Sequence, residues 1–275
     1  MDSMNPNAES ATTTLPSDTE TKMSEQEQRE RLRKEERRKE HIAMLESALK
    51  SVRPYNTLGT DMTDDAVYNL HARLIAQCAS HLLSRHGKRL ILDEYNKDVF
   101  KFLMLYFNGS PLALDVFPDA NYSLDKNIML VGEAGVGKTL IMDAMAMYLE
   151  KTHNPRAYKT VSHTQMLNYF KLHNNIDLFT FNTSDNDTYE GKPFSLCLND
   201  MGLRTQKFYG NDTEAIIEEF LYARYEIWEQ AGMATHITTN LDKNDIERLF
   251  NDEHGRLADR FKMFNVIHVG GSSRR

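Results

Sequence analysis

The sequence predicts an α/β fold, a parallel sheet flanked by helices, preceded by a small helical module. Two observations carry the prediction for the sheet. Apolar strand patterns alternate with helical patterns between residues 127 and 268, and such alternation is typical of a parallel sheet. Residues 132–139 read G-E-A-G-V-G-K-T, directly after an apolar strand and directly before a helix. Glycines at this spacing before Lys-Thr are the pattern of a phosphate-binding loop, or P-loop.

Composition narrows the class of protein. The 275 residues suffice for a core domain of common size and an accessory domain. The formal charge of −7 argues against attraction of nucleic acid by the whole molecule, although a local basic patch can act alone. Cys78 and Cys197 lack metal-ligand spacing, so we expect buried thiols in a reducing compartment. We expect a cytoplasmic protein without a membrane segment, because no apolar run approaches ~18 residues and the start lacks a signal-peptide pattern.

The first forty residues divide into a polar tail and a charged helix. Residues 1–22 are rich in Ser, Thr, Asn, Asp and Pro, so we expect them to be disordered. Ser24 and Glu27 form a capping-box pattern that predicts a helix start. Residues 29–40 are almost entirely charged, with favourable pairs four positions apart. Two interpretations stay open for this helix: a solvated surface, or contact with nucleic acid or a partner.

Two amphipathic helices are expected next, at residues 64–84 and 94–107. Their apolar side chains recur every three or four residues, which predicts one buried face on each. With the charged helix they make up a helical module at residues 23–110. The core then occupies residues 111–275, and residues 111–121 are the expected linker.

The core is expected to alternate strands and helices. We predict strands at residues 127–131, 157–161, 195–198, 234–238 and 264–268. We predict helices at residues 138–151, 163–173, 213–229 and 243–250, with a short one at 253–262. Residues 174–191 are expected to form a long loop, and loops of that length are often functional.

The P-loop carries the chemistry of the first candidate site. Its glycines let successive backbone N–H groups surround a phosphate, and the following helix points its positive end at the same anion. Lys138 can reach the β- and γ-phosphates, and the Thr139 hydroxyl can bind Mg²⁺. The predicted nucleotide-contacting residues are Gly132, Glu133, Ala134, Gly135, Val136, Gly137, Lys138, Thr139 and Leu140.

The second candidate site follows an apolar strand. A P-loop enzyme needs an acid at the end of a neighbouring strand to hold Mg²⁺. Residues 195–200 read S-L-C-L-N-D, so Asn199 stands where the usual pattern has the first of two acids. An amide can hydrogen-bond a metal-bound water but brings no charge, which predicts slow hydrolysis. Asp200 then polarises the attacking water or takes over the metal. A merely structural strand end is the alternative.

Three further polar residues are candidates. Asn240 follows the apolar strand at 234–238, where a polar side chain can sense the γ-phosphate and orient water; it also fits a helix N-cap region. Arg256 and Arg260 are four apart in a short helix. They fit either a surface ion pair with Asp252 or Glu253, or an arginine finger that acts on a neighbouring subunit's nucleotide.

These motifs together resemble a known family. The order G-E-A-G-V-G-K-T, L-C-L-N-D-M-G, E-F-L-Y-A-R-Y-E, T-H-I-T-T-N-L and G-R-L-A-D-R-F is similar to that of the AAA+ ATPases of the DnaC-type helicase loaders. The related IstB-type transposition helpers share these motifs. The ending F-N-V-I-H-V-G-G-S-S-R-R resembles the DnaC-like branch of Bacteroidetes genomes and mobile elements. The resemblance covers residues 120–275, and more loosely the helical module.

The resemblance implies roles for single residues. Residues 132–139 match Walker A, Asn199 and Asp200 match Walker B, Asn240 matches sensor 1, and Arg260 matches the arginine finger. Lys138, Asp200, Asn240 and Arg260 are the implied catalytic residues. Thr139, Asn199 and Asp200 are the implied Mg²⁺ residues.

The resemblance also implies cofactors and partners. They are ATP and Mg²⁺, a homo-oligomer, single-stranded DNA, and a replicative helicase gripped by the N-terminal region. The expected function is an ATP-dependent helicase loader or remodeller in DNA replication. Two alternatives stay open: a transposition helper that acts with a transposase, and a weakly hydrolysing nucleotide-switch scaffold. A small-molecule kinase is disfavoured, because no arginine-rich lid pattern follows the P-loop.

Overall fold

The computed structural model describes residues 61–181, 192–202, 207–208, 211–249 and 256–274, and seven residues between 28 and 39. The chain divides into two compact units, residues 1–52 and residues 53–275. The described residues of the first unit are helical and exposed. The predictions for residues 1–22, for the capping box at 24–27 and for the loop after residue 181 lie outside the described residues.

The helices of the second unit agree closely with their sequence patterns. They are α2 (Asp65–Ser84), α3 (Lys97–Phe107), α4 (Lys138–Lys151), α5 (His163–His173), α6 (Thr213–Ala231), α7 (Lys243–Leu249) and α8 (Arg256–Phe261), with short 3-10 turns at Pro111–Ala113 and Asp177–Phe179. Asp64 caps α2 by accepting from two backbone N–H groups, and Ser162 with Gln165 forms a complete capping box at α5. Such side chains satisfy the N–H groups that a helix start leaves free.

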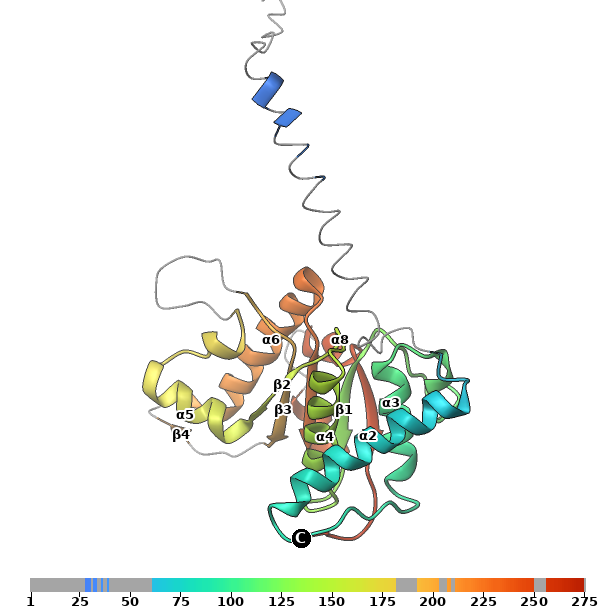
Figure 1. Cartoon of the computed structure of the whole chain (residues 1–275). Helices are drawn as coiled ribbons and strands as arrows, with labels where there is room; N and C mark the ends of the chain where they lie inside the picture. Colours follow the sequence, from blue (N-terminus) through green and yellow to red (C-terminus); the bar gives the residue numbers. More distant parts are fainter. Residues whose placement is uncertain are drawn as a thin grey trace, which may run out of the picture. The chain divides into compact units, whose positions relative to one another are not determined.

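Five parallel strands form the central sheet (Figure 1). They are β1 (Asn127–Val131), β2 (Lys159–Ser162), β3 (Leu196–Met201), β6 (Thr235–Thr239) and β7 (Phe264–His268), in the order β2-β3-β6-β1-β7. Because all strands are parallel, their carboxyl ends meet at one edge. A loop after β1 therefore lies beside loops after β3 and β6, which is where open α/β sheets bind ligands. The fold is an α/β P-loop fold.

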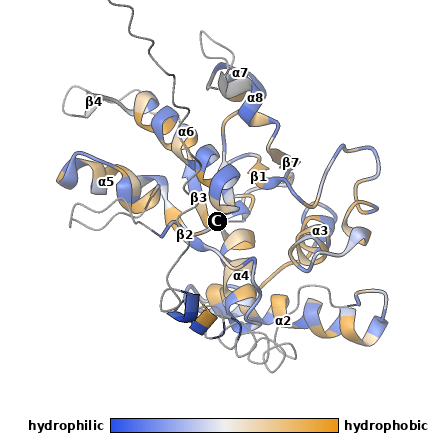
Figure 2. Ribbon diagram, turned by 90° about the horizontal axis from the view of Figure 1, so that it is seen from above, coloured by the Kyte–Doolittle hydropathy of each residue, from blue (hydrophilic) through white to orange (hydrophobic). Residues whose placement is uncertain are grey.

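Helices cover both faces of the sheet, as predicted. Ile128 and Leu130 of β1 pack with α2, α3 and α4, whereas Met129 between them packs with α5, α6 and α7. Figure 2 shows α2 and α4 on one side of the sheet and α6 and α7 on the other. Successive strand side chains point to opposite faces, so a continuous apolar run such as residues 128–131 is what a strand covered on both faces requires.

The strands differ from the prediction in two respects. The third strand runs to Met201 rather than ending at residue 198, and its pairing with β6 is irregular between Leu198 and Met201. Asn199 and Asp200 therefore lie within an irregular strand, not after it. The short hairpin of β4 (Lys207–Phe208) and β5 (Asn211–Asp212) was not predicted, because two-residue strands have no readable periodicity.

The helices α2 and α3 share a core with α4. The ring nitrogen Nδ1 of His71 lies 2.8 Å from the Tyr148 hydroxyl, which also accepts a 2.9 Å hydrogen bond from Asn108. Both helices belong to the same compact unit as the sheet. A separate module that ends at residue 110 stays a prediction. None of the described helices is long and apolar enough to span a membrane.

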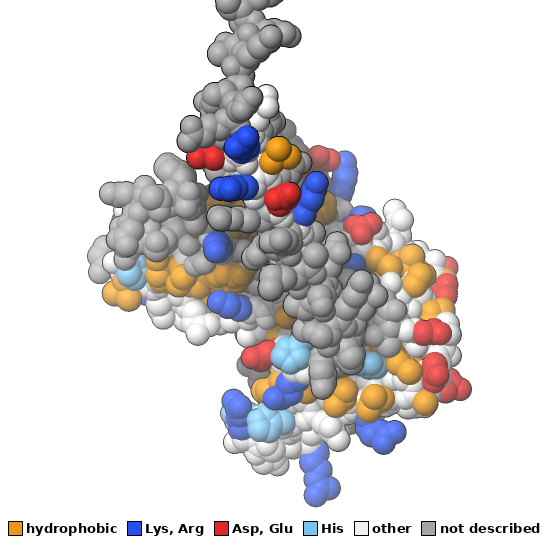
Figure 3. Space-filling model, turned by 45° about the horizontal axis from the view of Figure 1, so that its top comes forward, with side chains coloured by type: hydrophobic (Ala, Val, Ile, Leu, Met, Phe, Trp, Pro, Cys, Tyr) orange, Lys and Arg blue, Asp and Glu red, His pale blue; other side chains and the backbone are white. Residues whose placement is uncertain are grey.

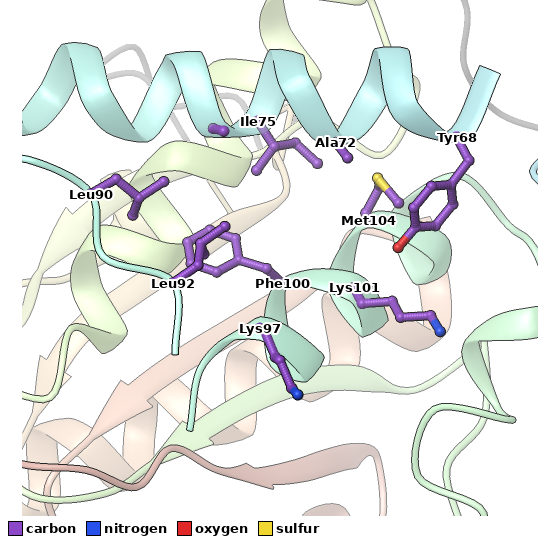
Figure 4. Close-up of a pocket in the computed structure, with 10 residues that line it drawn as sticks. Tyr68, Ala72, Ile75, Leu90, Leu92, Lys97, Phe100, Lys101 and Met104 are labelled. Atoms are coloured by element: carbon purple, nitrogen blue, oxygen red, sulfur yellow. The ribbon is translucent and has the colours of Figure 1, made fainter. Parts of the chain in front are cut away.

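An apolar groove of about 220 Å³ lies between α2 and α3. Figure 4 shows its lining, to which α2, α3 and the connection between them contribute. Apolar side chains form the floor, and Lys97 and Lys101 stand on one side. Leu92 of the connection is 54% exposed. The lining comprises Tyr68, Ala72, Ile75, Ala76, Leu90, Leu92, Lys97, Phe100, Lys101 and Met104.

Candidate nucleotide site

The P-loop joins β1 to α4 and depends on its glycines. Gly135 has a φ of +91°, in the left-handed region that glycine adopts without strain. A Cβ atom on Gly132 would lie 2.2 Å from the carbonyl oxygen of Val269. The loop therefore has the backbone form that its sequence pattern predicts, at the carboxyl edge of the sheet. The 14-residue α4 begins at Lys138 and directs its N-terminal end at the loop.

Lys138 lies inside the loop, with only 5% of its surface exposed. Its ammonium group donates to the carbonyl oxygens of Gly132 at 2.7 Å and Glu133 at 2.8 Å. Buried charges need such partners, because burial removes their hydration. The side chain is thus held in the concavity in which a P-loop binds phosphate.

Asp200 faces the start of α4. Its φ of +56° is rare for a residue with a side chain, and it falls in the irregular part of β3. Such bulges re-aim a side chain. Here the Asp200 carboxylate accepts a 3.2 Å hydrogen bond from the Thr139 hydroxyl, while the Asp200 N–H donates to Thr238 at 2.9 Å. The strained backbone therefore presents an exposed carboxylate beside the P-loop hydroxyl.

Asn199 points away from that carboxylate. It is 4% exposed, and its amide donates to Asp143 of α4 at 3.1 Å and accepts from the Thr238 hydroxyl at 3.2 Å. The pKa of Asp143 is raised overall, chiefly by burial. The hydrogen bonds from Asn199 and Thr160 oppose this shift, and the charge of Asp200 adds to it. Asn199 thus links α4 to β6 and is absent from the described lining of the cleft.

A cleft of about 890 Å³ collects most of the predicted residues. Lys138, Thr139, Asp200 and Asn240 line it together. Among its described lining residues, four are cationic (Lys88, Lys138, Lys171 and Arg274) and two are anionic (Asp200 and Asp245). Figure 3 shows Lys, Arg and His side chains gathered at the lower end of the molecule, toward which the C-terminal end of α2 points in Figure 1. An excess of positive charge suits a polyanionic ligand.

Arg260 does not line this cleft. Its guanidinium lies 4.1 Å from the ring centre of Tyr222 and 4.9 Å from that of Tyr225, both on α6. These cation–π contacts hold the half-buried side chain in place. The side chain of Arg256 lies outside the described residues. The structure therefore leaves Asn199 and Arg260 apart from the cleft and brings eight of the predicted residues together in it: Ala134, Gly135, Gly137, Lys138, Thr139, Leu140, Asp200 and Asn240.

Several residues at the site were not predicted from the sequence, among them Asp143 and Arg274. Asp143 stands four positions after Thr139 in α4, a spacing that places both on one helix face and that could have identified it. Arg274 contacts the P-loop from the other end of the chain, and no local pattern identifies such a contact.

The donor set fits a Mg²⁺–nucleotide complex. The Thr139 hydroxyl and the Asp200 carboxylate are oxygen ligands of the kind that Mg²⁺ takes, usually one or two carboxylates with water and phosphate oxygens. They adjoin the loop that encloses Lys138. Oxygen ligands and phosphate-binding groups are therefore in contact in one cleft.

Comparisons with known proteins give similarity in structure only. No family model matches the sequence, and no curated protein matches it. A protein described as a primosome component from Streptococcus pyogenes serotype M3 is 18% identical, with a TM-score of 0.43 over 66% of this chain and 84% of that chain. A DnaC helicase loader is 20% identical, with a TM-score of 0.38 over 58% and 87%.

The chain also resembles AMPPCP-bound DnaA from Aquifex aeolicus. The identity is 15% and the TM-score 0.39, over 66% of this chain and 48% of that chain, so the chain spans about half of DnaA. All three TM-scores are below 0.5. The α/β P-loop assignment therefore stands on the strand order and the loop geometry of this chain.

Proposed function

We propose that this protein is an AAA+ ATPase of the DnaC type that loads or remodels a replicative helicase at single-stranded DNA, in the cytoplasm. The observation that carries the ATPase part is the contact between Thr139 and Asp200 beside the buried Lys138. This juxtaposition supplies a phosphate-binding loop, a cation and a metal-binding oxygen pair in one cleft, which phosphoryl transfer requires.

Each residue has a distinct role in this proposal. Lys138 and the backbone of residues 132–140 hold the phosphates of ATP. Thr139 and Asp200 hold Mg²⁺, and Asn199 acts on it only through water or through Asp200. Asn240, exposed in the cleft, orients the attacking water. ATP with Mg²⁺ supplies the transferable γ-phosphate group when bound.

Arg260 acts on the nucleotide of a second copy of the chain. Its placement outside the cleft, against two tyrosine rings, suits a guanidinium that is pre-positioned for a neighbour. A homo-oligomer is therefore part of the proposal. Mixing Arg260→Ala subunits with Lys138→Ala subunits tests it, because each variant supplies what the other lacks. Restored ATP turnover in the mixture supports a finger in trans, and two inactive variants that stay inactive when mixed argue against it.

The helicase contact is assigned to residues 23–110, which precede the core at 111–275 and follow the tail at 1–22. The apolar groove between α2 and α3 supports this assignment, because Lys97 and Lys101 beside it make no ion pair with the described residues. An apolar groove with such cations on one side suits a partner segment that carries apolar and acidic side chains.

Co-purification of the full-length chain with the replicative helicase tests the loader function. Leu92→Glu places a charge in the groove and is expected to abolish binding. Leu114→Glu, at an apolar side chain that is 38% exposed outside the groove, is the matched control and is expected to bind normally. Binding to a transposase instead of the helicase would favour the transposition helper and overturn the loader proposal.

A nucleotide switch is the second candidate, favoured by one observation. Asn199 is buried and uncharged at the position where the usual pattern has the first of two acids. Its amide hydrogen-bonds Asp143 and is absent from the described lining of the cleft. Steady ATP turnover stimulated by single-stranded DNA would exclude a pure switch. Binding of ATP without turnover would favour it.

A further inference from the structure

We infer that Arg274 is a positioning residue for the P-loop, held in place by Asp93. The inference rests on the proposed nucleotide site and extends it to the segment after β7. Arg274 lines the nucleotide cleft and also lines a second cavity between the P-loop and the connection from α2 to α3. It therefore lies at the junction of three parts of the fold.

The segment that carries Arg274 runs along the P-loop. Val269, directly after β7, donates its N–H to the Val131 carbonyl at 2.8 Å. Further along, the N–H of Arg274 donates to the Gly135 carbonyl at 2.9 Å. Its guanidinium donates to the carbonyl of Val136. Backbone and side chain of one residue thus bind two successive carbonyl groups of the loop.

Asp93 fixes the guanidinium from the other side. Its carboxylate lies 2.7 Å from Nη2 of Arg274, and the Asp93 and Arg274 side chains are only 31% and 22% exposed. The other carboxylate oxygen accepts from the N–H groups of Tyr95 and Asn96. The hydrogen bond from Arg274 is the main reason that the pKa of Asp93 lies below its usual value. A partly buried ion pair with further hydrogen bonds on both partners is better fixed than a surface pair.

Close packing seats the segment in one position. A Cβ atom on Gly135 would lie 2.3 Å from the Ser273 hydroxyl oxygen, and one on Gly271 would lie 3.3 Å from the ring of Tyr95. Glycine at these points allows the side chains of Ser273 and Tyr95 to pack directly against the backbone. The segment cannot shift along the P-loop without losing these contacts.

The consequence follows from peptide geometry. In a trans peptide the C=O and the following N–H point in opposite directions, and the peptide unit is rigid. Because Arg274 holds the carbonyls of Gly135 and Val136, the N–H groups of Val136 and Gly137 are fixed as well. Backbone N–H groups of a P-loop are its phosphate ligands. Arg274 therefore pre-organises two of them before the nucleotide arrives, which lowers the cost of binding.

The test compares arginine variants by ATP affinity and by turnover. Arg274→Ala is expected to weaken ATP binding by about tenfold or more, with a raised KM and a kcat within about twofold of wild type. Arg274→Lys can reach either Asp93 or Val136 but lacks the fork for both, so an intermediate affinity is expected. Asp93→Asn keeps a hydrogen-bond acceptor without the charge and is expected to weaken binding less than Arg274→Ala.

Arg156→Ala is the matched control. The Arg156 guanidinium also donates to a backbone carbonyl, that of Tyr106 at 2.8 Å, but it lines a cavity apart from the P-loop. We expect it to lower the melting temperature and leave ATP affinity unchanged. Wild-type affinity in Arg274→Ala overturns the inference, and so does an equal loss of affinity in Arg156→Ala, which indicates a general structural effect.

Two outcomes separate this inference from the proposed function. If the wild type binds ATP, Lys138→Ala does not, and Arg274→Ala binds normally, the nucleotide site stands and only the role of Arg274 fails. If the wild type does not bind ATP, the proposed function fails and the inference fails with it.

Discussion

The Thr139 hydroxyl donates a 3.2 Å hydrogen bond to Asp200, a residue 61 positions further along the chain. Thr139 stands in the first turn of α4, and Asp200 stands in the irregular part of β3. The contact joins the start of α4 to β3, a strand that β6 separates from the P-loop strand β1. It requires Asp200 to hold a left-handed backbone conformation, which costs roughly 1–2 kcal/mol for a residue with a Cβ atom. Strain of this kind clusters at functional sites.

Asp200→Asn tests this contact. The amide keeps the shape and an acceptor for Thr139 but removes the charge that Mg²⁺ needs. We expect ATP turnover to fall by about 100-fold or more, with ATP binding within a few-fold of wild type, because a metal ion mainly stabilises charge that develops in the transition state. Asp245→Asn, at the other described acid of the cleft, is the control and should retain turnover. Equal turnover in both variants would show that Asp200 has no role in hydrolysis.

The sequence predicts the parts of the site that local pattern determines. The strand before the P-loop and the helix after it have the bounds that periodicity predicts, 127–131 and 138–151, because glycine spacing and apolar runs are local. The bulge at Asp200 instead depends on the hydrogen bond from its N–H to the Thr238 hydroxyl of the neighbouring strand. The contact of Arg274 with the P-loop joins segments more than 130 positions apart, so it depends on tertiary packing and leaves no local signal.

Asn199 and Asp143 form a partly buried amide–carboxylate pair at 3.1 Å, and Asn199→Asp would place two carboxylates there. One of them must then take up a proton or repel the other. We expect a loss of roughly 2 kcal/mol or more in the free energy of unfolding at pH 8, measured by urea denaturation. The loss should shrink at lower pH, where one acid is protonated. Because the side chain at position 199 is absent from the described lining of the cleft, the added acid is not expected to speed hydrolysis.

The double variant Asn199→Asp with Asp143→Asn reverses the two side chains and restores an amide–carboxylate pair. We expect its stability to return close to wild type. If the double variant is as unstable as Asn199→Asp alone, repulsion between the two carboxylates is not the cause. Asp143→Asn alone completes the cycle. Because burial raises the pKa of Asp143, this variant should gain stability above that pKa and lose the gain below the usual value near 3.8.

Gly132→Ala tests the close approach of the segment after β7 to the P-loop. The added Cβ would lie 2.2 Å from the Val269 carbonyl oxygen, so one of the two backbones must move. We expect loss of ATP binding and a clear drop in melting temperature. Gly87→Ala is the matched control, since its φ is +65° but no atom lies within 4 Å of the added Cβ. It should cost only about 1 kcal/mol of backbone strain and leave ATP binding intact.

The lowered pKa of the buried His236 predicts that the free energy of unfolding depends on pH. The ring lies within β6, packs against Phe107 and Tyr158, and accepts a 3.1 Å hydrogen bond from the Ile128 N–H at Nδ1. Burial, followed by the charges of Arg224 and Arg156, lowers the pKa of His236 to about 3. The folded protein therefore keeps the ring neutral at pH values at which the unfolded chain, with a pKa near 6.5, is protonated.

The sign of the effect follows from this difference. The unfolded chain binds a proton that the folded chain does not. The contribution of the neutral His236 ring to the free energy of unfolding is therefore complete above about pH 6.5 and is lost as pH falls toward about 3. The slope approaches roughly 1.4 kcal/mol per pH unit for one group.

His236→Gln removes the titration of this ring. The free energy of unfolding of the variant should be lower at about pH 8 through lost packing but should fall less steeply between about pH 6.5 and 4. Replacement of the exposed His81 should leave the wild-type slope. A wild-type slope in His236→Gln would mean that other groups, chiefly carboxylates, account for the acid sensitivity.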